Sequence, residues 1–375
     1  MQIGDMRMET RSISGLPMIR RMGRTTETDG RLNLFWTASG ADFCFRGAEI
    51  HAAFTSCYSF LEQWISVEAD GCFLLRMPLP YGKSEVCLLR GLDRDVIHRI
   101  RIFKEVQVMS EDPDSFLSLD DLIFDGEVLA PPESALTLEF IGDSITSGEG
   151  TFGQTGDMEQ ISPFFGVENN YALMTADSLN AKFSCISQSG WGLVSDYHNN
   201  PFRVLPPYYE KVCGVASGKL NIAAGAHDLY DFLADPSDFV IINLGTNDEG
   251  AFHEEPWIEP ETGDVFSQSL DEFGNPSLRS QERIRRSAVN FLKKLRQCNP
   301  GAQMIWCYGM LGNLLAHDLA GAVASYQSVT GDSKAHFLLL PPVREGMYGS
   351  RMHPGRPAHE AAAGMLTAYI RQLRG

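Results

Sequence analysis

The chain has 375 residues, of which 43% are hydrophobic and 21% charged, a balance typical of a globular protein with a sizeable core. Its formal net charge of −17 argues against a nucleic-acid-binding surface and against binding to anionic membranes. We therefore expect small neutral partners, no nucleic acid and no membrane, whereas the oligomeric state is left open.

The beginning of the chain and its cysteines bear on the cellular compartment. Residues 1–24 carry several arginines and lack the apolar segment of a secretory signal. No later run approaches the ~20 apolar residues that a membrane span requires. The eight cysteines are scattered, without a C-x-x-C pair, and several lie in apolar runs, as reduced core cysteines do. These features predict a cytoplasmic protein.

The first third of the chain consists of short apolar runs separated by turn residues. Several runs alternate apolar and polar positions with the period of two that is typical of β-strands, and no long helix is evident. The runs are 32–36, 41–45, 49–54, 64–67, 86–89 and 98–102. This pattern predicts an all-β sandwich domain over residues 1–132.

The pattern changes after Pro131 and Pro132, which form a stiff, non-helical connector. Apolar strand-like runs then alternate with helical segments, two of which (284–295 and 362–373) place their apolar residues on one face. The strand-like runs are 136–141, 183–187, 238–244, 303–308 and 336–340. We predict an α/β domain over residues 133–375, with three layers and a central parallel sheet.

The end of the first of these strands carries a candidate nucleophile. The apolar run up to Ile141 leads into Gly142, Asp143 and Ser144. A serine placed where a strand gives way to a helix exposes its hydroxyl and has backbone N–H groups nearby, as acyl transfer requires. The tripeptide alone is common, and three later segments provide the support for a catalytic role of Ser144.

Those three segments have the residue types that such a site needs. Residues 189–192 (Ser-Gly-Trp-Gly) follow the second strand, and residues 245–248 (Gly-Thr-Asn-Asp) follow the third. Residues 352–354 (Met-His-Pro) open the last helix. Ligands of parallel sheets bind beyond the carboxyl ends of the strands, so we expect these segments to meet there.

Together the segments supply the roles of ester hydrolysis. Ser144 would attack the acyl carbon, while His353 takes its proton and passes it to the leaving alkoxide. The main-chain N–H groups of Ser144 and Gly190 and the side-chain amide of Asn247 would form the oxyanion hole. One such donor typically lowers the barrier by about 3 kcal/mol.

These blocks resemble the SGNH hydrolases, also called GDSL esterases and lipases. Ser144, Gly190, Asn247 and His353 match the residues that give the family its name, one by one. No metal and no cofactor is needed for this chemistry.

A longer resemblance covers almost the whole chain. It is to carbohydrate esterase family two, whose members are acetyl esterases with a jelly-roll domain ahead of the SGNH domain. The segments that carry it are 34–40, 98–104, 125–126 and 139–146. The resemblance implies a jelly-roll fold for the sandwich and an SGNH-hydrolase fold for the second domain.

The resemblance also implies the substrate: O-acetyl groups on carbohydrates, often at the 6-hydroxyl of hexoses, removed through an acyl-serine on Ser144. An acetylated oligosaccharide or another small neutral ester is the expected partner. Trp191 is a candidate wall for a sugar ring, with the core as its alternative location. Tyr208, Tyr209 and Trp257 lie in irregular segments and would extend that surface.

One position departs from the family pattern. SGNH enzymes usually carry Asp three residues before the histidine, and here that residue is Ser350. Removing the orienting acid of a triad can cost on the order of 10⁴ in rate. The resemblance includes enzymes with a Ser–His dyad whose ring is held by backbone carbonyls, and we expect such a dyad here. Glu345 or another loop carboxylate is the alternative. Asp143 and Asp248 are interpreted as supporting hydrogen-bonding groups.

Other motifs favour ordinary structural roles. Residues 148–153 match G-x-G-x-x-G but do not directly follow the strand, so a dinucleotide site is not predicted. Residues 253–255 (His-Glu-Glu) are adjacent and point apart, which does not suit a metal. We expect His359 and Glu360 at the surface of the last helix, and His98 in a structural role.

Two rival functions remain open. The first is hydrolysis of another small acyl substrate, such as a thioester or a lysophospholipid, by the same residues. The second is a carbohydrate-binding protein with a decayed site, which the missing acid at Ser350 suggests.

Overall fold

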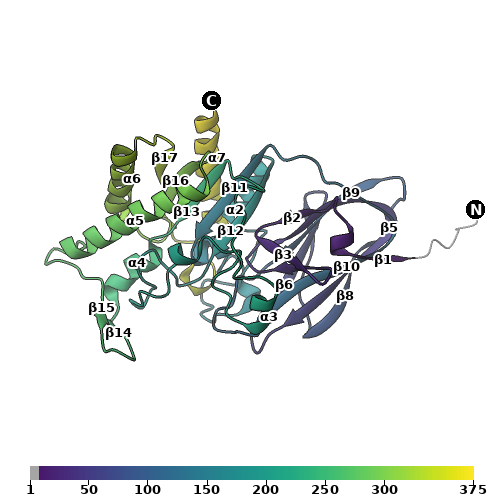
Figure 1. Cartoon of the computed structure of the whole chain (residues 1–375), viewed down its shortest axis with the longest axis horizontal. Helices are drawn as coiled ribbons and strands as arrows, with labels where there is room; N and C mark the ends of the chain where they lie inside the picture. The colour runs from purple at the N-terminus through teal and green to yellow at the C-terminus, as the bar shows by residue number, and fades with distance from the viewer. Residues whose placement is uncertain (1–7) are drawn as a thin grey trace, which may run out of the picture. The chain divides into compact units, whose positions relative to one another are not determined.

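The computed structural model describes residues 8–375 and divides the chain into two compact units (Figure 1). The first unit contains the chain up to Glu133, together with residues 161–163 and 211–230. The second unit contains the remaining residues up to Gly375. Across the described residues, no helix combines the length and the apolar character that crossing a membrane requires.

The first unit is built on an antiparallel sheet in the order β3-β4-β10-β5-β9-β6-β7, with β1 paired to β10, and β2 and β8 paired to β5. Its side chains alternate between a buried cluster and the outer face, as strand geometry requires. The strands are β1 (Glu9–Ser12), β2 (Arg20–Met22), β3 (Thr25–Thr28), β4 (Arg31–Leu34), β5 (Gly40–Cys57), β6 (Trp64–Ala69), β7 (Cys72–Pro78), β8 (Gly82–Arg90), β9 (Ile97–Lys104) and β10 (Phe116–Leu129). The expected antiparallel β region is confirmed.

Two predicted strands, 41–45 and 49–54, are parts of one 18-residue strand, β5. The glycine between them, Gly47, does not mark a turn. It lies opposite Gly126 of β10 beside an irregularity in the register. A Cβ on Gly126 would lie 2.1 Å from the carbonyl oxygen of Arg46, so the pair permits a close approach of two backbones.

The second unit contains a parallel five-stranded sheet in the order β12-β11-β13-β16-β17. Every pairing along this order is parallel, which confirms the predicted α/β fold with a central parallel sheet. The five predicted runs correspond to β11 (Leu136–Gly142), β12 (Ala181–Ser187), β13 (Phe239–Asn243), β16 (Gln303–Tyr308) and β17 (Ala335–Leu339).

Helices lie against both faces of this sheet (Figure 1). The ring of Phe140 in β11 contacts Tyr171 of α2, and the ring of Trp306 in β16 contacts Phe291 of α5. Trp306 is in register with Ile141, so it and Phe140 point to opposite faces. The helices of this unit are α1 (Ser144–Ser147), α2 (Tyr171–Ser178), α4 (Thr246–Gly250), α5 (Leu278–Cys298), α6 (Ala316–Thr330) and α7 (Arg356–Arg374); α3 (Lys219–Ala223) belongs to the first unit.

Irregular segments and a short hairpin complete the second unit. The segment after α4 forms a small hairpin of β14 (Trp257–Ile258) and β15 (Val265–Phe266). The single 3₁₀ turns of the two units together are η1 (Ile13–Gly15), η2 (Ser162–Phe164), η3 (Pro206–Tyr208), η4 (Ala251–His253) and η5 (Ser350–Met352).

The prediction for His359 was wrong. The residue is fully buried in α7, stacked on Tyr171 with ring centroids 5.9 Å apart. Its Nδ1 accepts a hydrogen bond of 3.1 Å from the N–H of Tyr171, an N–H left free by the start of α2. Burial lowers the pKa of His359 to about 3. Glu360, the next residue, is exposed as expected.

The interpretation of the cysteines as core residues holds for only part of the set. Cys44, Cys185, Cys213 and Cys307 are buried, and Cys57 and Cys298 are half-buried. Cys72 and Cys87 are exposed, because their strands direct these positions to the outer face of the antiparallel sheet.

Candidate active site

Ser144 lies just beyond the carboxyl end of β11, as the first residue of α1, and only 5% of it is exposed. Its Oγ is 2.8 Å from Nε2 of His353, a hydrogen bond between residues 209 positions apart. The tight change from strand to helix requires Gly142, because a Cβ there would lie 2.0 Å from Oγ1 of Thr146. The structure thus brings the predicted nucleophile and its predicted base into contact.

Asp143 caps the helix that carries Ser144. Its Oδ1 accepts a 3.0 Å hydrogen bond from the N–H of Ile145, as a helix N-cap does. The carboxyl group is fully buried, and this burial, together with the negative charge of Asp248, raises the pKa of Asp143 to about 7. Asp143 therefore supports the position of Ser144 through the helix backbone.

The other nitrogen of the His353 ring fixes its tautomer. Nδ1 lies 2.9 Å from the carbonyl oxygen of Arg351. A carbonyl oxygen can only accept a hydrogen bond, so Nδ1 of the neutral ring must carry the proton. Nε2 then presents its lone pair to the hydroxyl of Ser144. This arrangement is the one that a general base needs.

An unusual backbone turn holds that carbonyl against the ring. Arg351 and Met352 both adopt left-handed conformations, with φ of 53° and 56°. Such a conformation costs about 1–2 kcal/mol for a residue with a side chain. Arg351 is anchored on two sides: its N–H donates to the carbonyl of Asp157 over 2.6 Å, and its guanidinium forms an ion pair with Glu149. These contacts offset the strain.

Two carboxylates were possible substitutes for the missing acid, and neither holds Nδ1. Glu345, named from the sequence, is exposed, and no hydrogen bond links it to the ring within residues 8–375. Glu149 is buried, and its Oε2 lies 3.9 Å from Nε2 of His353, beyond hydrogen-bond distance. Glu149 was missed in the sequence because it belongs to the glycine-rich run after Ser144. It places a negative charge beside the imidazole.

Ser350, at the position where the SGNH pattern usually has its acid, faces away from the histidine. It is fully buried, and its Oγ donates to the carbonyl oxygen of Phe152 over 3.0 Å. Its own carbonyl accepts the N–H of His353 over 3.0 Å. The backbone of this segment, and not the side chain at position 350, therefore contacts the catalytic candidate.

The predicted oxyanion donors follow the neighbouring strands. The N–H of Gln188 donates to the carbonyl of Gly142 over 3.2 Å, which places the loop with Gly190 beside the end of β11. Gly190 has φ of 78°, and a Cβ there would meet no atom within 4 Å. The Cα of Gly190 therefore borders open space. The N–H of Ser144 is also outside the helical ladder, because it opens α1.

Asn247 lies in the first turn of α4 and is largely buried. Its Nδ2 donates one hydrogen bond of 2.9 Å to the carbonyl oxygen of Trp191. An amide nitrogen carries two hydrogens, so one is left for another acceptor. The bond to Trp191 fixes the amide beside the loop that contains Gly190.

Asp248 shapes that loop. Its buried carboxylate accepts the N–H groups of Leu193, Val194 and Ser195 at 2.8, 2.7 and 3.2 Å. Burial raises the pKa of Asp248 to about 6, although the three N–H groups act in the opposite direction. The carboxylate makes no contact with His353 among the described residues. Its role is to fix the backbone that follows Gly190.

The aromatic residues proposed as a sugar surface differ in location. Trp191 is only 7% exposed and contacts Tyr208, with ring centroids 5.5 Å apart. Tyr209 was wrongly assigned to this surface. It is buried, donates its hydroxyl hydrogen to Glu139 and packs edge-on against Phe291 of α5.

Trp257 lies in a separate part of the second unit. It contacts Phe202 edge-on, with ring centroids 5.5 Å apart. The two rings and Phe266 line a surface pocket of about 460 Å³ with an acidic rim. No sequence pattern indicated this pairing, because Phe202 and Trp257 come from different irregular segments.

Comparison with known proteins shows full-length similarity to enzymes. No family model matches the chain. It is 27% identical over 350 residues to the cellulase/esterase CelE of Acetivibrio thermocellus. That match covers 91% of this chain but only 37% of the relative, so the chain spans little more than a third of that protein.

Two solved structures extend over nearly the whole chain. An acetyl xylan esterase (Est2A) from the rumen bacterium Butyrivibrio proteoclasticus has a TM-score of 0.96 and 35% identity, covering 98% of this chain and 99% of its own. A family two carbohydrate esterase from Clostridium thermocellum, in complex with cellohexaose, has a TM-score of 0.77 and 23% identity. That match covers 95% of this chain and 99% of the neighbour, and it bears on the fold alone.

The absence of a side chain at Gly150 leaves space for His353. Gly150 has φ of 80°, and a Cβ there would lie 2.4 Å from Cβ of His353 and 2.7 Å from the carbonyl oxygen of Ser350. Gly150→Ala should displace the ring from Ser144 and slow labelling of Ser144 by a fluorophosphonate at least about 10²-fold. Gly156→Ala, where a Cβ meets nothing within 4 Å, is the control. Labelling of Gly150→Ala at the wild-type rate would contradict the geometry.

Proposed function

Because the chain belongs to family two of the carbohydrate esterases, we propose that it hydrolyses O-acetyl esters of carbohydrates, with Ser144 as nucleophile and His353 as general base. The family resemblance expected from the sequence is confirmed, and its members are carboxylic ester hydrolases. The observation that carries the mechanism is the 2.8 Å contact between Ser144 Oγ and His353 Nε2.

The reaction would proceed in two displacements. Ser144 Oγ attacks the acetyl carbon while its proton moves to Nε2 of His353, and the carbonyl oxygen becomes an oxyanion. The N–H groups of Ser144 and Gly190 and the free amide hydrogen of Asn247 stabilise that charge, each by about 3 kcal/mol. The tetrahedral species expels the sugar alkoxide, which takes the proton from His353. Water then attacks the acetyl-serine by the same route and releases acetate.

The catalytic pair is proposed to be a dyad. The carbonyl of Arg351 orients the ring and accepts the Nδ1 hydrogen throughout the reaction. When the ring becomes an imidazolium, the buried carboxylate of Glu149, 3.9 Å from Nε2, stabilises the new positive charge by electrostatic attraction. An acid at position 350 is not required for either task.

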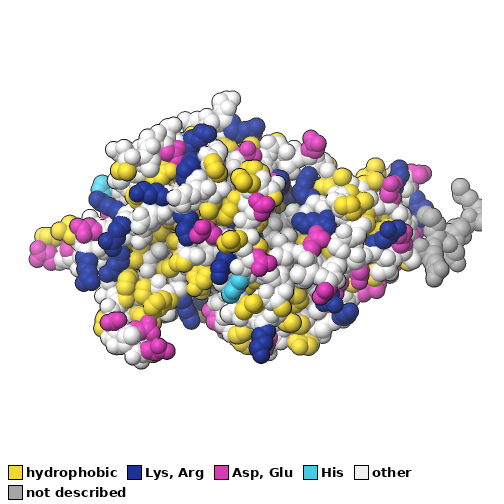
Figure 2. Space-filling model, in the orientation of Figure 1, with side chains coloured by type: hydrophobic (Ala, Val, Ile, Leu, Met, Phe, Trp, Pro, Cys, Tyr) yellow, Lys and Arg dark blue, Asp and Glu magenta, His cyan; other side chains and the backbone are white. Residues whose placement is uncertain are grey.

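Family membership and surface charge support a carbohydrate substrate. The named relatives are an acetyl xylan esterase and an esterase in complex with cellohexaose, so we propose acetylated xylo- or gluco-oligosaccharides, including 6-O-acetyl hexoses. On the face shown in Figure 2, basic and acidic side chains are interspersed, which suits a neutral ligand. Trp191, largely buried, would contact a sugar with its exposed edge.

The two parts of the chain are proposed to have different roles. We propose residues 1–132 as a jelly-roll-like accessory domain and 133–375 as the catalytic domain. All of the candidate catalytic residues lie in the second unit, which supports this division. The eight cysteines carry free thiols, which supports a reducing compartment such as the cytoplasm.

The two rival functions are separated by simple assays. The decayed-site alternative was motivated by Ser350, and the Arg351 carbonyl supplies the orientation that the acid would give. A different acyl substrate on the same residues would show a preference for long chains on nitrophenyl esters, whereas an acetyl esterase would prefer acetate.

Acetate release tests the function. Wild-type protein should release acetate from a panel of acetylated xylo-, manno- and gluco-oligosaccharides, and Ser144→Ala should lower kcat by at least about 10⁴-fold, because the nucleophile is lost. Ser178→Ala, an exposed serine in α2, serves as the control. Unchanged release by Ser144→Ala would contradict the mechanism. No release by the wild type, with nitrophenyl acetate also intact, would favour a carbohydrate-binding protein.

Substitution of Ser350 tests the dyad. Ser350→Asp introduces the acid that SGNH enzymes usually carry at this position, but its carboxylate would be buried against the carbonyl of Phe152. We expect no increase in kcat and a free energy of unfolding about 1–3 kcal/mol below that of Ser350→Asn, which has the same size without charge. Urea denaturation and acetate release measure the two quantities. A clear rise in kcat for Ser350→Asp alone would show that the site is an incomplete triad.

A further inference from the structure

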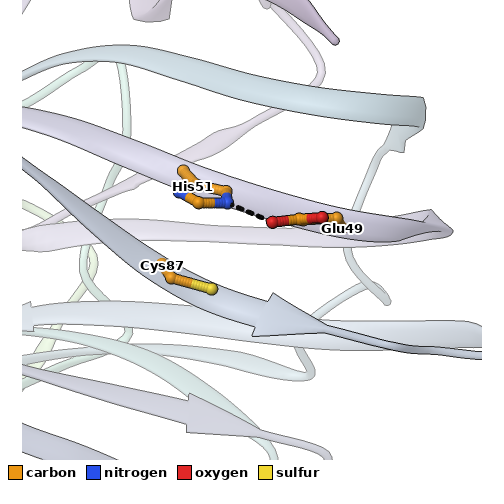
Figure 3. A group of neighbouring side chains, drawn as sticks. All are labelled: Glu49, His51 and Cys87. Atoms are coloured by element: carbon orange, nitrogen blue, oxygen red, sulfur yellow. Dashed lines mark hydrogen bonds and ion pairs between the residues drawn. The ribbon is translucent and has the colours of Figure 1, made fainter. Parts of the chain in front are cut away.

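A second group of reactive side chains lies on the antiparallel sheet of the first unit, on neighbouring strands β5 and β8 (Figure 3). His51 of β5 is the register partner of Cys87 in β8, and Glu49 precedes His51 by two positions. Ile50 and Ala52, which alternate with them, are fully buried. Glu49, His51 and Cys87 therefore project from the outer face of the sheet.

The three side chains converge. Nε2 of His51 lies 2.8 Å from Oε1 of Glu49, and one donor atom from each of Glu49, His51 and Cys87 lies within 4.8 Å of the others. A tetrahedral zinc ion separates its ligand atoms by roughly 3.2–3.8 Å. Small rotations of these partly exposed side chains would therefore bring all three donors to one ion.

A further carboxylate holds the other side of the ring. Nδ1 of His51 lies 2.8 Å from Oε1 of Glu85. A neutral imidazole carries one hydrogen, so it can donate to only one of the two glutamates. If Nδ1–H donates to Glu85, the lone pair of Nε2 faces the carboxylate of Glu49. That contact is repulsive unless a proton or a cation lies between the two atoms.

We propose that Glu49, His51 and Cys87 bind a divalent transition metal of the zinc type, with water as the fourth ligand. Imidazole nitrogen, carboxylate oxygen and thiolate sulfur are the three donors that Zn²⁺ takes in proteins. Ca²⁺ and Mg²⁺ prefer oxygen ligands alone and do not suit this set. Glu85, accepting the Nδ1 hydrogen, orients the ring as carboxylates commonly do for metal-bound histidines.

The ordinary alternative is a protonated His51 shared by two glutamates. The side chains of Glu49 and Glu85 are 41% and 54% exposed, and exposed ion pairs contribute at most about 1 kcal/mol. That alternative gives the thiol of Cys87 no role. The metal site requires the thiol as a ligand, so experiments on Cys87 distinguish a metal site from a protonated His51.

Cobalt provides the spectroscopic test. Wild-type protein, reduced and freed of metal with a chelator, should bind one equivalent of Co²⁺ with a thiolate-to-cobalt charge-transfer band, and Zn²⁺ should abolish the band by displacement. Cys87→Ser should lose the band. His51→Gln should bind at least about 10-fold more weakly, and Glu85→Gln should lose about 10-fold or more in affinity because the ring is no longer oriented.

Cys72→Ser is the matched control, since Cys72 is the other exposed cysteine and begins β7. Its cobalt band should equal that of the wild type. Alkylation of Cys87, mapped by mass spectrometry, should be slowed by Zn²⁺ and restored by chelator, which tests the site in unmodified protein. No cobalt band in the wild type, a band that persists in Cys87→Ser, or Cys87 alkylation indifferent to Zn²⁺ would each overturn the proposal.

Discussion

The hydrogen bond from Nδ1 of His353 to the carbonyl of Arg351 is the interaction on which the site depends. It sets the tautomer of the ring and so decides which nitrogen meets Ser144. The carbonyl reaches the ring because Arg351 and Met352 take left-handed conformations, and because Gly150 leaves room beside the histidine. A triad uses a buried carboxylate to orient the ring; here a backbone carbonyl does so.

The remainder of the site is positioned by the parallel sheet. The loops after β11, β12 and β13 carry Ser144, Gly190 and Asn247, and their strands are adjacent in the sheet. The two buried aspartates act on backbone: Asp143 caps α1, and Asp248 gathers three N–H groups of the loop after Gly190. The side-chain amide of Asn247 and the loop after Gly190 are thus held by hydrogen bonds within the protein.

Sequence patterns predicted those features that depend on residues close together in the chain. The five strands of the parallel sheet are continuous apolar runs, and the four site segments each begin at a strand end or a helix start. Contacts that depend on tertiary packing could not be predicted in this way. The burial of His359 against Tyr171, the turn at Arg351 and the pairing of His51 with Cys87 depend on neighbours distant in sequence. Gly47, inside β5, was interpreted as a break between two strands, because glycine is common both in turns and at β-bulges.

The tautomer of His353 is the most direct test of this account. It can be measured from the ¹⁵N chemical shifts of the ring nitrogens in protein labelled at histidine, at a pH where the ring is neutral, with His353→Gln used for assignment. We expect a protonated Nδ1 and an unprotonated Nε2, because only an N–H can donate a hydrogen bond to the Arg351 carbonyl. A neutral ring with its proton on Nε2 would contradict it, since that nitrogen could not then accept the proton of Ser144.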